Sequence, residues 1–119
     1  MVDLAAFPGD TRDIAGEDLA PTHCCDAETC DGVRLYHCDF VLADPPYGES
    51  DARHCGTAMV KRNKVVQTLS GGLPSGAFIV WLDQVMPMYR KTELKIEAVI
   101  GIVGSTNNRF RVLAVFRKV

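Results

Sequence analysis

The sequence predicts an α/β domain with a mostly parallel sheet that ends in an antiparallel hairpin. Two short apolar runs, 40–43 and 77–82, are rich in branched and aromatic residues and flanked by turn formers, which is typical of strands buried on both faces. An amphipathic stretch lies between these two runs. Two further β-rich runs, 99–103 and 110–116, follow at the C-terminus and are joined by a short polar segment, the pattern of a hairpin.

The remaining elements follow from periodicity and turn residues. Segment 52–69 has the apolar spacing of a helix, and Gly71, Gly72 and Pro74 then predict its end. Residues 88–98 mix apolar and charged positions in a way that favours a second helix. In the first third we expect short strands at 12–15 and 22–25, and a polar loop over 28–37.

Length and composition predict a single domain over residues 1–119. The apolar fraction of 47% and the charged fraction of 24% are ordinary for a globular protein and argue against extended disorder. No apolar run approaches the roughly 20 residues that span a bilayer. A secretory signal requires a basic stretch followed by an apolar one, and the N-terminus lacks this pattern. We therefore expect a cytoplasmic protein without membrane contact, whose five cysteines are reduced thiols.

One motif has a specific chemical use. The apolar run 40–43 leads directly into Asp44-Pro45-Pro46-Tyr47. Two consecutive prolines fix the backbone and remove two donors, so their carbonyls are free acceptors. Asp44 follows the carboxyl end of a strand, where open α/β sheets bind ligands. A carboxylate and a proline carbonyl together can accept two hydrogen bonds from one amino group, and Tyr47 offers a flat face for a planar ring.

This motif resembles the signature of S-adenosylmethionine-dependent methyltransferases that act on exocyclic amino groups, such as the adenine-N6 and cytosine-N4 DNA methylases. The resemblance covers roughly residues 13–118 and implies a Rossmann-like fold. It implies that Asp44 and the Pro45 carbonyl orient the amino nitrogen, that Pro46 stiffens the turn, and that Tyr47 stacks on a base flipped from the duplex. Asp44 would also adjoin the cofactor.

The same resemblance implies cofactor contacts in the first third of the chain. Glu17 or Asp18 matches the acid that holds the ribose hydroxyls. Asp26 and Ala27 match the positions that contact the adenine ring. Gly9 matches a glycine of the loop that faces the methionine carboxylate. No metal ligands are implied.

The sequence departs from the family at its N-terminus. Phe7 replaces the first glycine of the loop over 3–11, and only about two residues separate Thr11 from the next strand-like segment. That leaves no room for the usual helix of about ten residues. We therefore expect a truncated first strand-helix unit, and a cofactor site that is reduced, completed by a partner chain or lost.

The charge distribution suggests the kind of partner. Residues 1–48 carry ten acids and two bases, whereas residues 49–119 carry five acids and eleven bases. A basic second part predicts possible contacts with nucleic-acid phosphates. The candidate residues are Lys61, Arg62, Lys64, Arg90, Lys91, Arg109 and Arg111. Because no separate target-recognition segment is present, we also expect a homo-oligomer.

Two other interpretations stay open. Three His-Cys pairs, at 23–24, 37–38 and 54–55, supply ligand types that suit zinc, but their spacing matches no known zinc module. Alternatively, the chain is a non-catalytic methyltransferase-like remnant that acts as a homo-oligomeric binding or regulatory protein.

Overall fold

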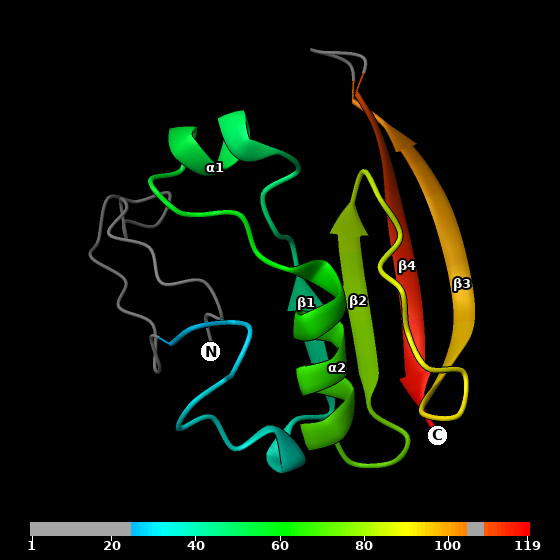
Figure 1. Ribbon diagram of the computed structural model, residues 1–119. Coiled ribbons are helices and arrows are strands. Elements are labelled where there is room, and N and C mark those ends of the chain that lie inside the picture. The colour runs from blue at the N-terminus through cyan, green and yellow to red at the C-terminus, as the bar shows by residue number, and fades with distance from the viewer. Residues whose placement is uncertain (1–24, 105–108) are drawn as a thin grey trace, which may run out of the picture.

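A computed structural model describes residues 25–104 and 109–119 and shows one mixed sheet with the longest helix against one face (Figure 1). The strands are β1 (Phe40–Ala43), β2 (Phe78–Asp83), β3 (Leu94–Val103) and β4 (Phe110–Lys118), and the helices are η1 (Leu35–His37), α1 (Glu49–His54) and α2 (Arg62–Gly72). The strand order is β1-β2-β4-β3, with β1 and β2 parallel and the other two pairs antiparallel. The α/β class and the C-terminal hairpin are therefore confirmed. The expectation of a mostly parallel sheet is wrong for the described strands, because one pair is parallel and two are antiparallel.

The predicted strand-helix-strand unit is present, but its helical stretch is divided. Instead of one helix over 52–69, α1 ends at His54 and α2 begins at Arg62. Gly56 adopts φ 70°, a conformation that glycine tolerates. The amide of Gly56 donates to Arg53 and that of Thr57 to Ala52, which is the bonding pattern of a Schellman cap. This left-handed cap ends the first helix, a break that the apolar periodicity does not reveal.

The second predicted helix, over 88–98, is wrong. A turn over 90–93, in which the amide of Leu94 donates to the Arg90 carbonyl, leads directly into β3. Leu94 and Ile96 alternate with Lys95 and Glu97, which is the period of a strand with one buried side. Pairing of β3 with β4 along their whole length then outweighs the helix propensity of the charged residues.

The core lies between α2 and the sheet. Val66 and Leu69 of α2 pack with Ile79 and Trp81 of β2, and each of the four is at most 1% exposed. The expected loop over 28–37 holds η1, whose Leu35 joins this core. A Cβ on Gly72 would lie 2.6 Å from the Leu35 side chain, so this close approach requires glycine.

The opposite face of the sheet leaves apolar side chains exposed, among them Phe40, Leu42 and Phe78. Figure 1 shows the β3–β4 hairpin reaching beyond the carboxyl ends of β1 and β2. The predicted strand at 12–15 and nearly all of the one at 22–25 lie outside the described residues, and Cys25, the one described residue of the second, is not in a strand.

Candidate functional site

The candidate site lies at the edge of the sheet where β1 and β2 end. These strands are parallel and in register, with Ala43 opposite Trp81, so Asp44 and Asp83 leave the sheet at the same edge. Strand β4 runs the other way and pairs Val112 with Asp83, which brings its first residues to this edge. The topology thus gathers the predicted motif, a second aspartate and the start of β4.

The motif turn is held by its own side chains. The Tyr47 hydroxyl donates a hydrogen bond of 2.9 Å to Asp44 Oδ1. Burial and this hydrogen bond to Asp44 raise the pKa of Tyr47, so its hydroxyl stays protonated at neutral pH. Asp44 itself is exposed. The structure therefore brings the predicted residues Asp44 and Tyr47 together, with one carboxylate oxygen already engaged.

Two arginines of the hairpin flank this turn. The Arg111 guanidinium lies 5.2 Å from the centre of the Tyr47 ring, within cation–π range, and its Nη1 donates to the Tyr47 hydroxyl at 3.3 Å. Arg111 Nε is buried without a hydrogen-bond partner among the described residues. Arg109 pairs with Asp51 of α1 at 2.9 Å. One face of the Tyr47 ring is therefore covered by a cation.

A small hollow of about 180 Å³ opens beside the turn. It is lined by Asp44, Pro45, Pro46, Tyr47, Asp51, Cys55 and Arg109. Sites that enclose a drug-sized ligand have roughly 300–1,000 Å³. The hollow therefore has room for part of a ligand, such as one planar ring, and the described residues alone do not enclose the whole of S-adenosylmethionine.

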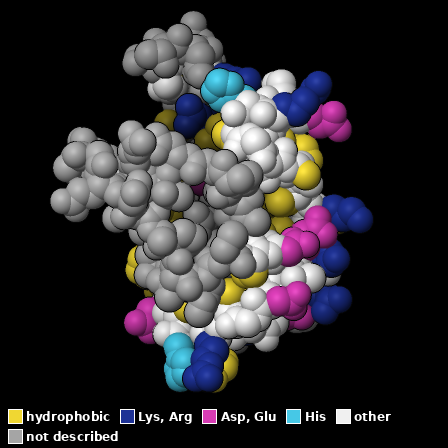
Figure 2. All heavy atoms as spheres, turned by 90° about the vertical axis from the view of Figure 1, so that its left-hand side faces the viewer, with side chains coloured by type: hydrophobic (Ala, Val, Ile, Leu, Met, Phe, Trp, Pro, Cys, Tyr) yellow, Lys and Arg dark blue, Asp and Glu magenta, His cyan; other side chains and the backbone are white. Residues whose placement is uncertain are grey.

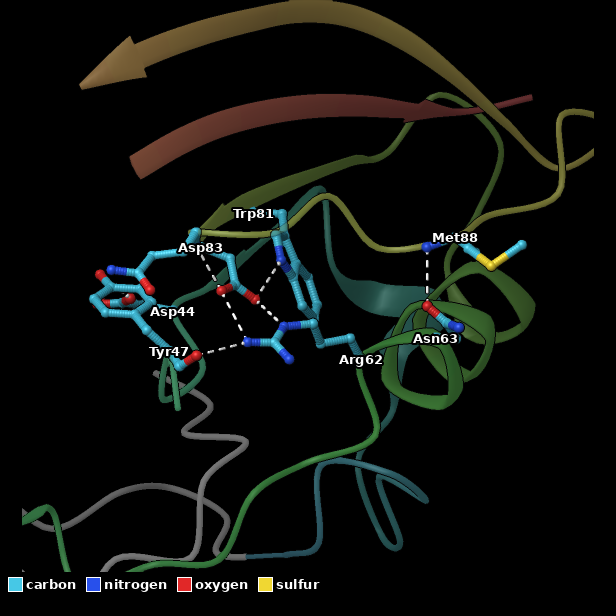
Figure 3. A network of polar contacts seen from close by, with 8 residues as sticks. Asp44, Tyr47, Arg62, Asn63, Trp81, Asp83 and Met88 are labelled. Carbon is cyan, nitrogen blue, oxygen red and sulfur yellow. Dashed lines mark hydrogen bonds and ion pairs between the residues drawn. The ribbon is translucent and has the colours of Figure 1, made fainter. Parts of the chain in front are cut away.

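A buried ion pair lies directly behind the motif turn (Figure 3). Asp83, which is 0% exposed, accepts hydrogen bonds from Arg62 Nε at 2.5 Å and Arg62 Nη2 at 3.1 Å. It also accepts from Trp81 Nε1 and from the amide of Gln84. Arg62 Nη2 donates in addition to the Tyr47 carbonyl at 3.0 Å. The hydrogen bond to Asp83 raises the pKa of Arg62, which stays charged.

Sequence reasoning missed this pair and assigned Arg62 to phosphate contacts. The sequence did contain a signal for this pair, namely an aspartate at the end of an apolar strand. Such a carboxylate is buried together with the strand and therefore needs a cationic partner. Arg62 begins the helix that connects β1 to β2, which makes it the nearest candidate.

Of the predicted cofactor contacts, Gly9, Glu17 and Asp18 lie outside the described residues. The Asp26 carboxylate accepts the Glu28 amide at 2.8 Å in a turn, and Ala27 packs against the core. Glu28 accepts the amide of Lys61, the residue before Arg62. This turn therefore lies against the beginning of α2, close to the motif edge.

Most of the predicted phosphate contacts make contacts within the chain. Lys64 pairs with Glu28 and Arg90 with Glu93, in addition to the pairs of Arg62 and Arg109. In Figure 2, Lys and Arg side chains along the right-hand border are interspersed with Asp and Glu. On the face shown, the described residues form no continuous basic surface.

Within residues 25–104 and 109–119, no three His, Cys, Asp or Glu side chains are grouped so that they could hold a metal ion. In the same part of the chain, every helix is too short or too polar to cross a bilayer.

The described residues form an α/β fold whose polar site lies where the two parallel strands end. A solved structure similar to this chain in fold is TrmN from Thermus thermophilus, at a TM-score of 0.53 and 14% identity. The match covers 86% of this chain and 28% of the TrmN chain. No protein-family model and no curated protein matches the sequence. At this identity the likeness establishes the fold alone.

Proposed function

We propose that the chain transfers a methyl group from S-adenosylmethionine to an exocyclic amino nitrogen, with a nucleobase in DNA as the preferred target. The observation that carries the proposal is Asp44, exposed at the mouth of the hollow and oriented by the Tyr47 hydroxyl. The likeness in fold to TrmN, an S-adenosylmethionine-dependent tRNA methyltransferase, supports methyl transfer in general and not the choice of DNA. RNA is therefore the second substrate to test.

The described residues have clear parts in such a reaction. The Asp44 carboxylate and the Pro45 carbonyl accept hydrogen bonds from the amino group and align its lone pair, which lowers the entropic part of the barrier. The carboxylate also offsets the positive charge that develops on nitrogen. The Tyr47 ring stacks on the target base through the face that Arg111 leaves open. S-adenosylmethionine, when bound, would supply the electrophilic methyl group and leave as S-adenosylhomocysteine, and the methylated nitrogen would lose one proton to water.

The cofactor contacts remain part of the proposal. Asp26 and Ala27 fit a contact to the adenine ring because their turn lies beside the start of α2. Gly9, Glu17 and Asp18 would complete the cofactor site.

The deciding experiment compares two aspartates that flank the same strand. Asp44→Ala should reduce methyl transfer to DNA or RNA by about 100-fold or more, since a group aligned with developing charge is removed. Asp39→Ala, at the other end of β1, should keep wild-type activity. Both variants should unfold at the wild-type temperature. Wild-type activity in Asp44→Ala would show that this turn does not carry the reaction.

Calorimetric titration with S-adenosylhomocysteine tests the cofactor separately. One ligand per chain indicates a complete pocket, and one per two chains indicates a shared one. No binding at millimolar ligand contradicts the proposal and favours the alternative, a non-catalytic homo-oligomer. The exposed side chains Phe40, Leu42 and Phe78 favour association through the open sheet face. Light scattering tests this, since a monomer at high concentration contradicts it.

A further inference from the structure

We propose that Arg62 and Asp83 form a positioning pair that sets the motif turn against the sheet by holding the Tyr47 carbonyl. The inference deepens the proposed function and rests on it. It gives Arg62 a role inside the fold, distinct from the phosphate contact that its charge suggested.

Asp83 is a rigid base for this arrangement. Its side chain is 1% exposed and lies at the last position of β2. Four donors from three other residues surround the carboxylate, namely two of Arg62, the indole of Trp81 and the amide of Gln84. A carboxylate with this many partners has one orientation, so it fixes the plane of the guanidinium that pairs with it.

Arg62 carries that orientation to the motif. Its Nη2 donates both to Asp83 Oδ1 at 3.1 Å and to the Tyr47 carbonyl at 3.0 Å. Figure 3 shows the guanidinium between Asp83 and the backbone of Tyr47. One planar group therefore joins the end of β2, the start of α2 and the turn that follows β1.

The turn needs such an anchor because it has few of its own. Pro45 and Pro46 have no amide hydrogen, so neither can donate to the sheet. Among the described residues, Tyr47 is held by Asp44, Arg62 and Arg111. Of these three, only Arg62 contacts the backbone of the turn. Loss of that contact should let Asp44 move relative to the hollow.

The next residue of α2 makes a parallel contact. Asn63 Oδ1 accepts the Met88 amide at 2.9 Å, in the segment that follows β2. The first two residues of α2 thus hold both chain segments that leave the carboxyl ends of the parallel strands. Apolar residues of similar volume often replace a buried ion pair without loss of stability, so stability alone does not explain why this pair is present. The arrangement therefore favours a role in site geometry.

Arg62→Lys separates positioning from charge. Lysine keeps the pairing with Asp83, but a compact ammonium group lacks the planar fork that also reaches the Tyr47 carbonyl. We expect a folded protein whose kcat falls about 10- to 100-fold, with the KM for S-adenosylmethionine changed less than about threefold. Arg117→Lys is the matched control, because Arg117 pairs with Glu97 at 2.7 Å, far from the motif. It should behave as wild type.

A spectroscopic titration reads the turn without relying on activity. The absorbance change at tyrosine ionisation, with that of the corresponding Tyr47→Phe protein subtracted, gives the pKa of Tyr47. In Arg62→Lys this pKa should fall from its raised value toward the ordinary 10.0, because the loosened ring gains solvent. In Arg117→Lys it should not move.

The outcomes separate the two proposals. If wild type transfers no methyl group but Arg62→Lys still lowers the Tyr47 pKa, the proposed function fails and the positioning pair stands. If wild type is active and Arg62→Lys leaves both kcat and the Tyr47 pKa unchanged, the positioning pair is overturned. Should Arg62→Lys not fold, the isosteric Asp83→Asn tests the same pair with the same two measurements.

Discussion

The parallel half of the sheet and the outer part of its hairpin differ in how far their apolar side chains are exposed to solvent. In the parallel half, formed by β1, α2 and β2, the helix covers the strands, and Leu69, Ile79 and Trp81 are at most 1% exposed. In the outer part of the β3–β4 hairpin, Val103 and Phe110 are 65% and 58% exposed. The parallel half is therefore the rigid support of the candidate site, whereas the hairpin tip is held mainly by its own ladder.

The same contrast extends to the polar groups at the edge. In the parallel half, the buried carboxylate of Asp83 accepts hydrogen bonds from Arg62, from the indole of Trp81 and from the amide of Gln84. On the hairpin, Arg111 Nε is buried without a hydrogen bond among the described residues. The motif turn therefore contacts a fully hydrogen-bonded ion pair on the side of the parallel strands and an incompletely hydrogen-bonded arginine on the side of the hairpin.

Two phenylalanines of the same strand offer the largest test of this difference. Phe116 is fully buried and lies 4.9 Å, centroid to centroid, from the Tyr89 ring, whereas Phe110 lies over Gly101 at the exposed end of β4. Phe116→Ala should lower the free energy of unfolding by about 3–5 kcal/mol, because it leaves a cavity in the core. Phe110→Ala should cost less than about 1 kcal/mol. Urea unfolding of both variants measures the two values.

Similar losses in the two variants would mean that the hairpin tip is as well packed as the core. That result would contradict the distinction drawn between the covered core and the outer part of the hairpin. It would also indicate that the exposed face of the hairpin is covered in solution, which light scattering of the same samples can check.

Local pattern predicted much of this fold. The runs at 40–43 and 77–82 became β1 and β2, as their continuous apolar residues between turn formers predicted. The expected burial of both faces was wrong, because every second residue of each strand is at least partly exposed. The hairpin followed from two β-rich runs around a polar connection. The division of the helix at Gly56 and the strand beginning at Leu94 were missed. Both depend on a backbone cap or on cross-strand pairing, which helix periodicity does not register.

The site was only half predictable for a related reason. Asp44 and Tyr47 are neighbours in the sequence, and their motif signals its use directly. Arg62 and Asp83 are 21 residues apart and meet only because β1 and β2 are parallel. A sequence pattern can indicate that Asp83 needs a partner, but the choice of Arg62 among eleven bases of the second part requires the topology.

The smallest effect concerns one side-chain hydrogen bond between the two halves, which the β2–β4 ladder already joins. The Ser70 hydroxyl of α2 donates at 2.6 Å to Glu93, the residue before β3. This bond, followed by that of Arg90, lowers the pKa of Glu93 below its ordinary value of 4.5. A carboxyl whose folded-state pKa is lowered adds stability above about pH 4.5, and this stability is lost as the pH falls through the folded-state pKa. Stability linked to Glu93 should therefore disappear in acid.

Ser70→Ala measures this connection through its pH dependence. At pH 7 its urea midpoint should lie below that of wild type, by a smaller difference than the one that Phe116→Ala causes. The gap between the midpoints of Ser70→Ala and wild type should narrow as the pH falls below 4.5, because Glu93 becomes protonated in both proteins. Thr68→Val is the control, because the Thr68 hydroxyl of the same helix donates to the backbone carbonyl of Glu28 and not to a carboxylate. Its gap should be the same at every pH. A constant gap for Ser70→Ala as well would show that Glu93 does not make the connection between the two halves sensitive to acid.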